Sequence, residues 1–410
     1  MTHVGRPPKR VAIVRHQDVY ELGLRREAEA LADAGYDTEV ICLRDPERPR
    51  KTVINGVSIT SLPVRRRKTS TARQLYEYMA FGLLAGATLV NRHLRRRYAV
   101  IQVNTMPDWL VYTAAIPKAL GARVIIHMKE PSPELAEILF GRPAMVGLFK
   151  QIEQRALRFS DHALTVTEAL KRRYVEHGAS ADRITVVLTG AARESQLAGW
   201  SPPESSEPDG FMLICHGTFE DRYGHETIID AAALLREELP DLRIVFTGRG
   251  STMQRMNEKV AELGLQGVVR NEGWVSFTRV NDLLAAADVG IVAQKASGYS
   301  HLVHTNKMVD YWIFGLPVIH SRLRATEEVY DDSILEYFEP GNAESLSKAI
   351  RRLHDNQDRR EELARNGRLA LERHGWPVQR EIYLGVFERL MGEDAETASS
   401  TAASIRRSCG

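Results

Sequence analysis

The sequence predicts an α/β protein built from two doubly wound units, each a parallel sheet with helices on both faces. Three observations support this. The chain has 410 residues, more than one hydrophobic core usually serves. Short apolar runs alternate with longer amphipathic segments, a pattern typical of parallel sheets. A stretch rich in Pro and Ser interrupts the alternation once, at residues 199–210.

The alternation in the first half begins with a strand at 11–14 and a helix at 20–35, which Gly35 ends. Further strands are predicted at 38–43, 57–62, 99–103, 123–127, 162–166 and 184–188. The clearest helices between them are expected at 79–90, 108–120 and 146–159. We place this N-terminal domain at residues 1–198.

After the linker at 199–210 the alternation starts again, and the second domain is placed at 211–375. Strands are predicted at 211–216, 242–247, 268–270, 289–293 and 317–320, and helices at 226–238, 253–263, 280–286 and 307–314. Residues 376–392 include a helix with an apolar face, and 393–410 have the composition of a disordered tail. Ligands of such sheets bind beyond the carboxyl ends of the strands, so the site is expected in a central cleft that both domains face.

Composition narrows the class of protein. Apolar residues make up 43% and charged residues 26%, as in ordinary soluble proteins, and the net charge of +2 does not indicate a nucleic-acid partner. The three cysteines are too scattered for a disulfide framework or a Cys-based zinc site. No apolar run is long enough to span a bilayer, and the polar, basic N-terminus lacks the core of a signal peptide. A cytoplasmic protein is expected.

Several common signatures are absent from the sequence. It has no GxGxxG after the first strand and no GxxxxGK, which argues against P-loop hydrolysis of ATP. It also has no HExxH and no Asp-x-Asp that would place two carboxylates on a divalent ion. We therefore expect a reaction that needs neither a metal nor a bound cofactor.

The segment from Cys215 to Gly224 closes one strand and opens a helix. Gly217 allows backbone amides to approach an anion, and a helix N-terminus adds partial positive charge. Arg222 is suited to bidentate contact with a phosphate. A plain strand–helix turn with a solvated arginine is the alternative.

A second polar segment, from His304 to Val318, places Lys307 at the start of a helix. Cations are disfavoured there, and a bound phosphate would relieve the conflict. Asp310, one turn further, is placed to accept hydrogen bonds from the vicinal hydroxyls of a ribose. The alternative is a Lys–Asp pair on a solvated helix.

At this point the second half resembles family 4 retaining glycosyltransferases of the GT-B fold, which has two Rossmann-like domains. The matching stretches are Gly217–Gly224, Phe246–Gly250, Gly273–Val275, Ala287–Val289 and Asn306–Tyr311 before Gly315–Val318. The first half resembles the family through Asn104–Asp108 and Glu130–Glu134, and the likeness covers roughly residues 10–392. It implies that the helix within 376–392 returns to the N-terminal domain.

The resemblance implies a donor site for a nucleoside diphosphate sugar, with UDP the first expectation for the base and GDP the next. The implied donor-binding residues are Gly217, Thr218, Arg222, Gly248, Arg249, Trp274, Val275, Asn306, Lys307 and Asp310.

Within that set, Arg222 and Lys307 would meet the diphosphate, Asp310 the ribose, and backbone groups of the Trp274–Val275 loop the base. Three positions depart from the family pattern. Thr218 stands where the family has an Arg, and Tyr223 stands nearest to the position of a family Lys. Leu302 takes the place of the first Glu in the family's two-Glu motif. The sequence thus carries an Asn-Lys-x-x-Asp variant of that motif.

In the first domain, Lys129 and Glu130 align with a family His-Asp pair. Glu130 would orient or deprotonate the acceptor hydroxyl, or alternatively pair with Lys129 at the surface. The family mechanism is retention by front-face attack, in which the leaving phosphate helps to deprotonate the acceptor. The acceptor class stays open among glycans, lipid-linked sugars and natural products.

The helix at 79–90 raises the question of a membrane partner. It is preceded by a basic run at 65–68 and followed by Arg92 and by arginines at 95–97. Such a helix suits the surface of an anionic leaflet, whereas the alternative is a core helix with solvated ends.

Two further functions stay open: a nucleotide-sugar 2-epimerase, and a catalytically degenerate binder of nucleotide sugars. A basic membrane adaptor would leave the Asn306–Asp310 motif unexplained.

Overall fold

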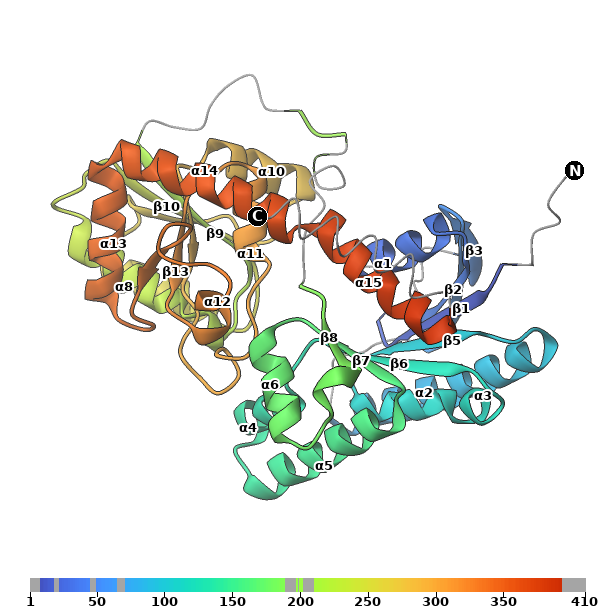
Figure 1. Cartoon of the computed structure of the whole chain (residues 1–410). Helices are drawn as coiled ribbons and strands as arrows, with labels where there is room; N and C mark the ends of the chain where they lie inside the picture. The colour runs from blue at the N-terminus through green and yellow to red at the C-terminus, as the bar shows by residue number, and fades with distance from the viewer. Residues whose placement is uncertain are drawn as a thin grey trace, which may run out of the picture. The chain divides into compact units, whose positions relative to one another are not determined.

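The computed structural model describes residues 8–17, 22–44, 49–64, 71–188, 197, 199–201 and 210–392. The chain divides into two units (Figure 1). Unit 1 consists of Met1–Leu188 with Gln379–Gly410, and unit 2 of Thr189–Val378. Most of the predicted linker, the basic run at 65–68 and the predicted tail at 393–410 lie outside the described residues.

Unit 1 contains an eight-stranded sheet in the order β3-β4-β2-β1-β5-β6-β7-β8. Only β3 runs antiparallel to its neighbour. The strands are β1 (Arg10–Arg15), β2 (Asp37–Leu43), β3 (Lys51–Ile54), β4 (Val57–Leu62), β5 (Val100–Asn104), β6 (Arg123–Met128), β7 (His162–Thr165) and β8 (Ile184–Val186). Sequence analysis missed β3, because its alternation of exposed and half-buried residues over four positions is too short to register.

Helices cover both faces of this sheet. They are α1 (Leu22–Asp33), α2 (Thr71–Arg95), α3 (Ala115–Ala119), α4 (Ser132–Phe140), α5 (Pro143–Phe159), α6 (Glu168–Glu176) and α15 (Trp376–Met391), with the 3-10 helices η1 (Asp108–Ala114) and η2 (Ala181–Arg183). In Figure 1, α2, α3 and α5 lie on one face, and α1 and α15 on the other. Right-handed crossovers require this division, because the chain moves one way from β1 to β2 and the other way from β4 through β8.

The single α-helix predicted at 108–120 is wrong. The segment forms η1 and then the short α3. Pro117 cannot donate a backbone hydrogen bond, so an α-helix is tolerated only if Pro117 falls in its first turn, and α3 begins two residues before it.

α15 starts at the end of unit 2 and packs against unit 1 over most of its length. The Tyr383 hydroxyl donates to Oε1 of Gln102 in β5 at 2.8 Å, and the Leu188 amide donates to Oε1 of Gln379 at 2.8 Å. Tyr383, Val386 and Phe387 are fully buried. The core of unit 1 therefore includes residues from the far end of the chain.

Unit 2 has a six-stranded, all-parallel sheet in the order β11-β10-β9-β12-β13-β14. Its strands are β9 (Phe211–Thr218), β10 (Leu242–Arg249), β11 (Val269–Asn271), β12 (Val289–Val292), β13 (Val318–Ser321) and β14 (Glu336–Phe338). Along β9, Leu213 and Cys215 face one hydrophobic core while Met212 and Ile214 face another. This alternation shows that helices cover both faces, as expected for a doubly wound sheet.

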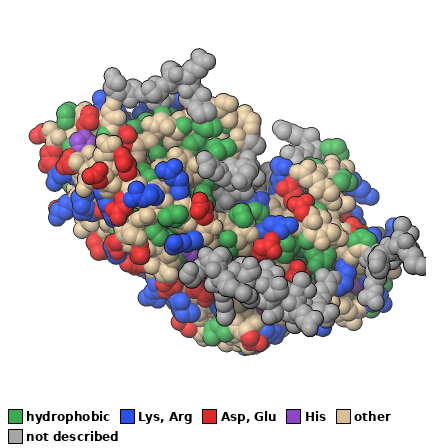
Figure 2. All heavy atoms as spheres, turned by 45° about the horizontal axis from the view of Figure 1, so that its top comes forward, with side chains coloured by type: hydrophobic (Ala, Val, Ile, Leu, Met, Phe, Trp, Pro, Cys, Tyr) green, Lys and Arg blue, Asp and Glu red, His purple; other side chains and the backbone are tan. Residues whose placement is uncertain are grey.

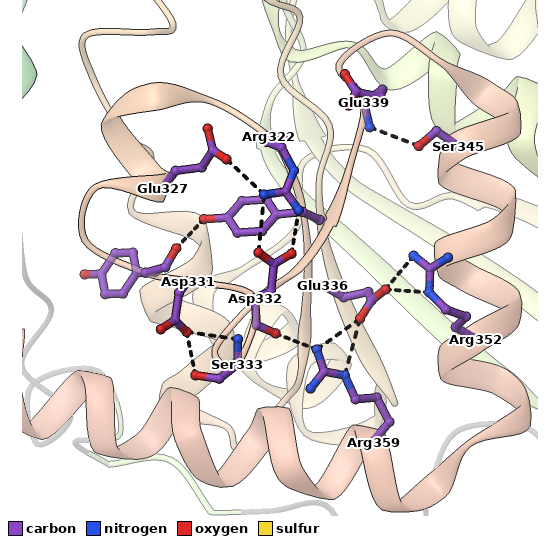
Figure 3. Close-up of polar contacts among 12 residues, drawn as sticks. Arg322, Glu327, Asp331, Asp332, Ser333, Glu336, Glu339, Ser345, Arg352 and Arg359 are labelled. Carbon is purple, nitrogen blue, oxygen red and sulfur yellow. Dashed lines mark hydrogen bonds and ion pairs between the residues drawn. The ribbon is translucent and has the colours of Figure 1, made fainter.

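The helices of unit 2 are η3 (Asp221–Tyr223), α8 (His225–Leu235), α9 (Met253–Glu262), α10 (Phe277–Ala286), α11 (Lys307–Ile313), α12 (Arg324–Glu327), α13 (Ala343–Asp355) and α14 (Gln357–His374). Ion pairs fasten the last two helices to the sheet edge (Figure 3). The Glu336 carboxylate in β14 accepts from Nε of Arg352 at 2.7 Å and from Nε of Arg359 at 3.4 Å. β14, α13 and α14 were not among the predicted elements.

Two surface findings bear on the sequence expectations. On the face shown in Figure 2, acidic and basic side chains are interspersed, in keeping with the small net charge. Within the described ranges, none of the helices combines the length and the apolar content that crossing a bilayer requires.

Candidate functional site

The carboxyl ends of β9 and β10 form the floor of the candidate donor site in unit 2. Gly217 pairs with Gly248 and Thr218 with Arg249, so four of the predicted residues lie side by side. Gly248 has φ +145°, and a Cβ there would lie 1.7 Å from the Gly217 carbonyl oxygen. Only glycine allows the two strands to approach this closely.

The loop after β11 is fastened to the same edge. The Gly248 amide and the Thr247 hydroxyl both donate to the Gly273 carbonyl, at 2.7 and 3.0 Å. This places Trp274 beside Arg249, whose guanidinium lies 4.3 Å from the indole centroid. Trp274 is 69% exposed and Val275 half-buried, so an aromatic side chain of this loop lies at the surface.

Lys307 lies at the start of α11, directly beside Gly217. A Cβ on Gly217 would be 3.0 Å from the Lys307 Cε. The Lys307 side chain is buried, and its ammonium lies 4.3 Å from the centroid of the Tyr223 ring. In the part of the chain that the structure describes, no carboxylate lies within ion-pair distance of it. A buried ammonium of this kind is well suited to an anionic ligand.

Arg222 lies in η3, close to the same tyrosine. Its guanidinium carbon is 5.0 Å from the Tyr223 ring centroid and 5.6 Å from that of Tyr299. Its backbone carbonyl accepts from the Lys295 amide at 2.9 Å, which fixes η3 to the loop after β12. Arg222 and Lys307 thus share Tyr223 as a neighbour, and their charges are concentrated at one end of the sheet.

Asp310 is one turn into α11, and its Oδ2 lies 3.6 Å from Nε2 of His216 at the end of β9. Burial, and then the charge of Lys307, lower the pKa of His216 to about 3. His216 is therefore neutral at ordinary pH and does not form an ion pair with Asp310. Asn306 precedes α11 with an exposed side chain, and its carbonyl accepts from the Asp310 amide at 3.2 Å.

Sequence reasoning did not single out His216 as a site residue, nor Tyr223 as the contact that Lys307 and Arg222 share. A signal for His216 was present, because it is a polar residue at the end of an otherwise apolar strand. Nothing in the sequence indicates the role of Tyr223, because its contacts depend on how η3 packs against α11.

In unit 1, Lys129 follows β6 and pairs with a carboxylate from another element. Its Nζ donates to Oε1 of Glu27 in α1 at 2.8 Å. Oε2 of Glu27 accepts from Nε2 of Gln102 at 2.8 Å and from Nδ2 of Asn104 at 3.2 Å. Burial opposes ionisation of Glu27, but Lys129 and then His127 outweigh it and hold the pKa well below its usual range.

Glu130 and Asp108, which belong to the first-half stretches that resemble the family, lie partly or wholly inside the fold of unit 1. Glu130 is half-buried, and its backbone carbonyl accepts from the Tyr174 hydroxyl at 3.4 Å. Asp108, at the start of η1, is 3% exposed, and burial raises its pKa to about 7. Asn104 and Asp108 therefore have roles inside the fold, and the acceptor chemistry of Glu130 stays a prediction.

The described residues contain no group of three or more His, Cys, Asp or Glu side chains arranged to hold a metal ion. The site in unit 2 instead gathers cations, backbone amides and one carboxylate.

Two protein-family models match consecutive parts of the chain. Residues 21–190 match the model of a glycosyl transferase 4-like domain, and residues 210–356 match the model of glycosyl transferases group 1. The chain belongs to the GT-B glycosyltransferases. The two matches in this order support assignment to family 4.

Among individual relatives, this glycosyltransferase is 28% identical to the lipopolysaccharide core biosynthesis glycosyltransferase LpsE of Rhizobium meliloti over 160 residues, which are 39% of this chain and 44% of LpsE. That alignment spans less than half of LpsE. This chain is 24% identical to the MMP alpha-(1->4)-mannosyltransferase of Mycolicibacterium hassiacum, with 92% of this chain and 96% of that protein aligned.

Two solved structures show the same fold. The sucrose-phosphate synthase of Thermosynechococcus elongatus superposes with a TM-score of 0.75 at 16% identity, covering 94% of this chain and all of the other. HepE of Anabaena, in complex with UDP and glucose, superposes with a TM-score of 0.65 at 15% identity, covering 93% and 98%. The prediction of two Rossmann-like domains in a GT-B fold is confirmed.

Proposed function

We propose that this protein transfers a sugar from a nucleoside diphosphate sugar to an acceptor hydroxyl, with retention of anomeric configuration and without a metal ion. The observation that carries the proposal is the buried ammonium of Lys307 beside Gly217, one helical turn from Asp310. It combines a phosphate-binding cation with a ribose-binding carboxylate. UDP is the first candidate for the base and GDP the second, and the HepE complex with UDP supports that order.

In the proposed reaction, negative charge grows on the leaving diphosphate while the sugar becomes oxocarbenium-like. Lys307, Arg222 and the amides at the strand ends would stabilise the diphosphate electrostatically. The departing phosphate would take the acceptor proton, so that no protein nucleophile is needed. In unit 1, Glu130 is the candidate to orient the acceptor hydroxyl. Lys129, next to Glu130 in the sequence, is the second candidate catalytic residue.

The acceptor is proposed to be a glycan, a lipid-linked sugar or a natural product, and for a lipid-linked acceptor the proposal includes peripheral contact with an anionic membrane. The comparisons give no support to the 2-epimerase alternative. A degenerate binder of nucleotide sugars differs from the transferase in a measurable way, because only the transferase converts donor and acceptor into a glycoside.

The test is calorimetric titration of UDP, GDP, dTDP and ADP in the presence of EDTA. We expect one of them to bind the wild type, and Asp310→Ala to weaken that binding by about tenfold or more through loss of the ribose contacts. The control is Asp230→Ala, which removes a half-buried carboxylate on α8 that pairs with Lys259.

If no nucleotide binds under these conditions, the metal-free donor site is wrong. If Asp310→Ala binds as tightly as Asp230→Ala, the ribose role of Asp310 is wrong. Anomeric NMR of the first product would then decide between retention and inversion.

A further inference from the structure

Tyr223 is the side chain that Lys307 and Arg222 both contact in the candidate donor site. The Lys307 ammonium lies 4.3 Å from the centroid of the Tyr223 ring, and the Arg222 guanidinium carbon lies 5.0 Å from it. At both distances an aromatic face attracts a cation. Among the described residues, the Lys307 ammonium makes neither a hydrogen bond nor an ion pair, so the ring is its direct partner.

The backbone of η3 holds Tyr223 in place, and its hydroxyl does not. The Tyr223 amide donates to the Glu220 carbonyl at 2.9 Å. The next residue, Gly224, has φ +59°, and a Cβ there would lie 2.0 Å from the carbonyl oxygen of Ala293, directly after β12. In the part of the chain that the structure describes, the Tyr223 hydroxyl has no hydrogen-bond partner. The face of the ring is therefore the part of this side chain that acts on its neighbours.

The two carboxylates of the η3 turn are occupied by other groups. Oδ1 of Asp221 accepts from Nζ of Lys295 at 2.9 Å and from the Arg255 guanidinium at 2.8 Å. Oε2 of Glu220 accepts from the Ser251 hydroxyl at 2.6 Å. Neither carboxylate pairs with the buried ammonium at the start of α11, so the positive charge there is not neutralised from this side.

An aromatic ring and a carboxylate hold a cation with different consequences for ligand binding. A carboxylate would neutralise the ammonium, and an incoming phosphate would have to displace it. The face of a ring attracts the cation through its quadrupole and has no net charge, so the positive charge stays available to a ligand. Because one ring contacts two cations, it keeps both where the two phosphates of one diphosphate can meet them together.

We infer that Tyr223 is a positioning residue that holds Lys307 and Arg222 together for the two linked phosphates of a diphosphate. A single phosphate is a poorer ligand, because it has fewer oxygens and less charge to divide between the two cations. The inference rests on the proposed function only for the nucleoside and the sugar that are attached to the diphosphate.

The test is calorimetric titration of inorganic pyrophosphate, inorganic phosphate and the nucleoside diphosphates UDP, GDP, dTDP and ADP into the full chain in the presence of EDTA. The wild type is expected to bind pyrophosphate about tenfold or more tightly than phosphate. Tyr223→Leu is expected to weaken binding of pyrophosphate, and of the nucleotide that the wild type binds, by about tenfold, because both cations lose the ring. Tyr223→Phe retains the ring and should restore both affinities.

The matched control is Phe211→Leu, at the amino end of β9. The Phe211 ring lies 5.4 Å from the Arg360 guanidinium carbon, so the control also removes an aromatic ring from a cation, but at the opposite end of the strand. Its affinities for pyrophosphate and nucleotide should match those of the wild type. Urea denaturation of each variant shows that it is folded.

A double variant tests whether the tyrosine acts through the lysine. The loss of pyrophosphate affinity caused by Tyr223→Leu should be clearly smaller in the Lys307→Met background than in the wild type. An equal loss in both backgrounds would show that Tyr223 acts independently of Lys307, which overturns the inference.

Three other results would also overturn it. Equal pyrophosphate affinity in Tyr223→Leu and Phe211→Leu would show that the ring has no part in binding. A loss in Tyr223→Phe as large as that in Tyr223→Leu would show that the hydroxyl is required and not the ring face. Weaker nucleotide binding in Tyr223→Leu with unchanged pyrophosphate binding would assign the ring to the nucleobase.

The same titrations separate this inference from the proposed function. If pyrophosphate binding depends on Tyr223 while none of the nucleotides binds, the inference stands and the donor assignment fails. If nucleotide binding depends on Asp310 but not on Tyr223, the donor assignment stands and the inference fails. Failure of all these ligands to bind the wild type overturns both.

Discussion

Lys307 is the residue at which stability and donor binding conflict most clearly. Its ammonium is buried beside Gly217 and contacts an aromatic ring, and no described residue supplies a matching carboxylate. Isolated buried charge is costly in a folded protein, whereas a diphosphate would pair with it. The same charge contributes to lowering the pKa of His216 and of His225 to about 3, after burial.

Replacing Lys307 by Met should therefore have opposite effects on stability and binding. Without nucleotide, the free energy of unfolding is expected to rise by about 1 kcal/mol. Affinity for the nucleoside diphosphate is expected to fall about tenfold or more. Urea denaturation and calorimetry measure the two quantities.

Lys295→Met is the matched control for Lys307→Met. It removes a cation of the same unit whose ammonium already pairs with Asp221 at 2.9 Å. If Lys307→Met neither stabilises the free protein nor weakens nucleotide binding beyond this control, Lys307 has no role in the donor site.

Among the structural elements, the β9–β10 edge depends most on a single residue type. Gly248 combines a positive φ with an approach to the Gly217 carbonyl that no side chain fits. The close contact between Gly217 and Gly248 also pairs Thr218 with Arg249 at the next position. The glycine at position 248 therefore determines both the pairing of the two strands and the geometry of the candidate site.

Gly248→Ala is expected to lower the free energy of unfolding by about 3 kcal/mol or more, because the strands must separate. Gly264→Ala serves as the control. Its φ of +66° is also positive, but a Cβ there meets nothing within 4 Å, so only the cost of a left-handed backbone, about 1 kcal/mol, is expected. Urea titration of both variants measures the difference, and equal losses would show that steric approach at Gly248 is unimportant.

Across the whole molecule, buried histidines make stability depend on pH. Burial is the main cause that lowers the pKa of His162, His304 and His320 to about 4 and those of His216 and His225 to about 3. Each stays neutral in the folded state at pH values where the unfolded chain takes up a proton. Their contributions to stability are intact above the ordinary histidine pKa of about 6.5 and are lost progressively below it.

His304→Gln tests this linkage at a half-buried position. Its folded pKa of about 4 against an ordinary value of 6.5 implies a loss of about 2 kcal/mol between pH 7.5 and pH 5. The variant should lose about that much less than the wild type when urea denaturation is compared at the two pH values. An identical loss in both proteins would show that His304 titrates in the folded state as it does in the unfolded chain.

The order of the elements and the fold class were predictable because they depend on local patterns. Apolar β-branched runs identified the strands of both sheets, and β4 was predicted at its observed bounds of 57–62. Elements without a strong pattern were missed: β3 is short and antiparallel, and β14 has three residues. Gly217 and Lys307 were proposed from the need of a phosphate site for glycine and positive charge at strand and helix ends, Asp310 as a ribose ligand and Gly248 from the family resemblance, and their roles stay predictions.

Only the tertiary structure determined which side chains meet. Lys129 pairs with Glu27, more than one hundred residues away, because β1, β5 and β6 are neighbours in the sheet and bring α1 beside the end of β6. Tyr223 is a neighbour of both Arg222 and Lys307 because the fold brings η3 beside the start of α11. Leu83 and Leu94 of α2 are exposed because the rest of unit 1 packs against the opposite side of that helix, at Phe81, Ala85 and Leu89. Periodicity along a chain shows that a helix is apolar on two sides, but only packing shows which side remains uncovered.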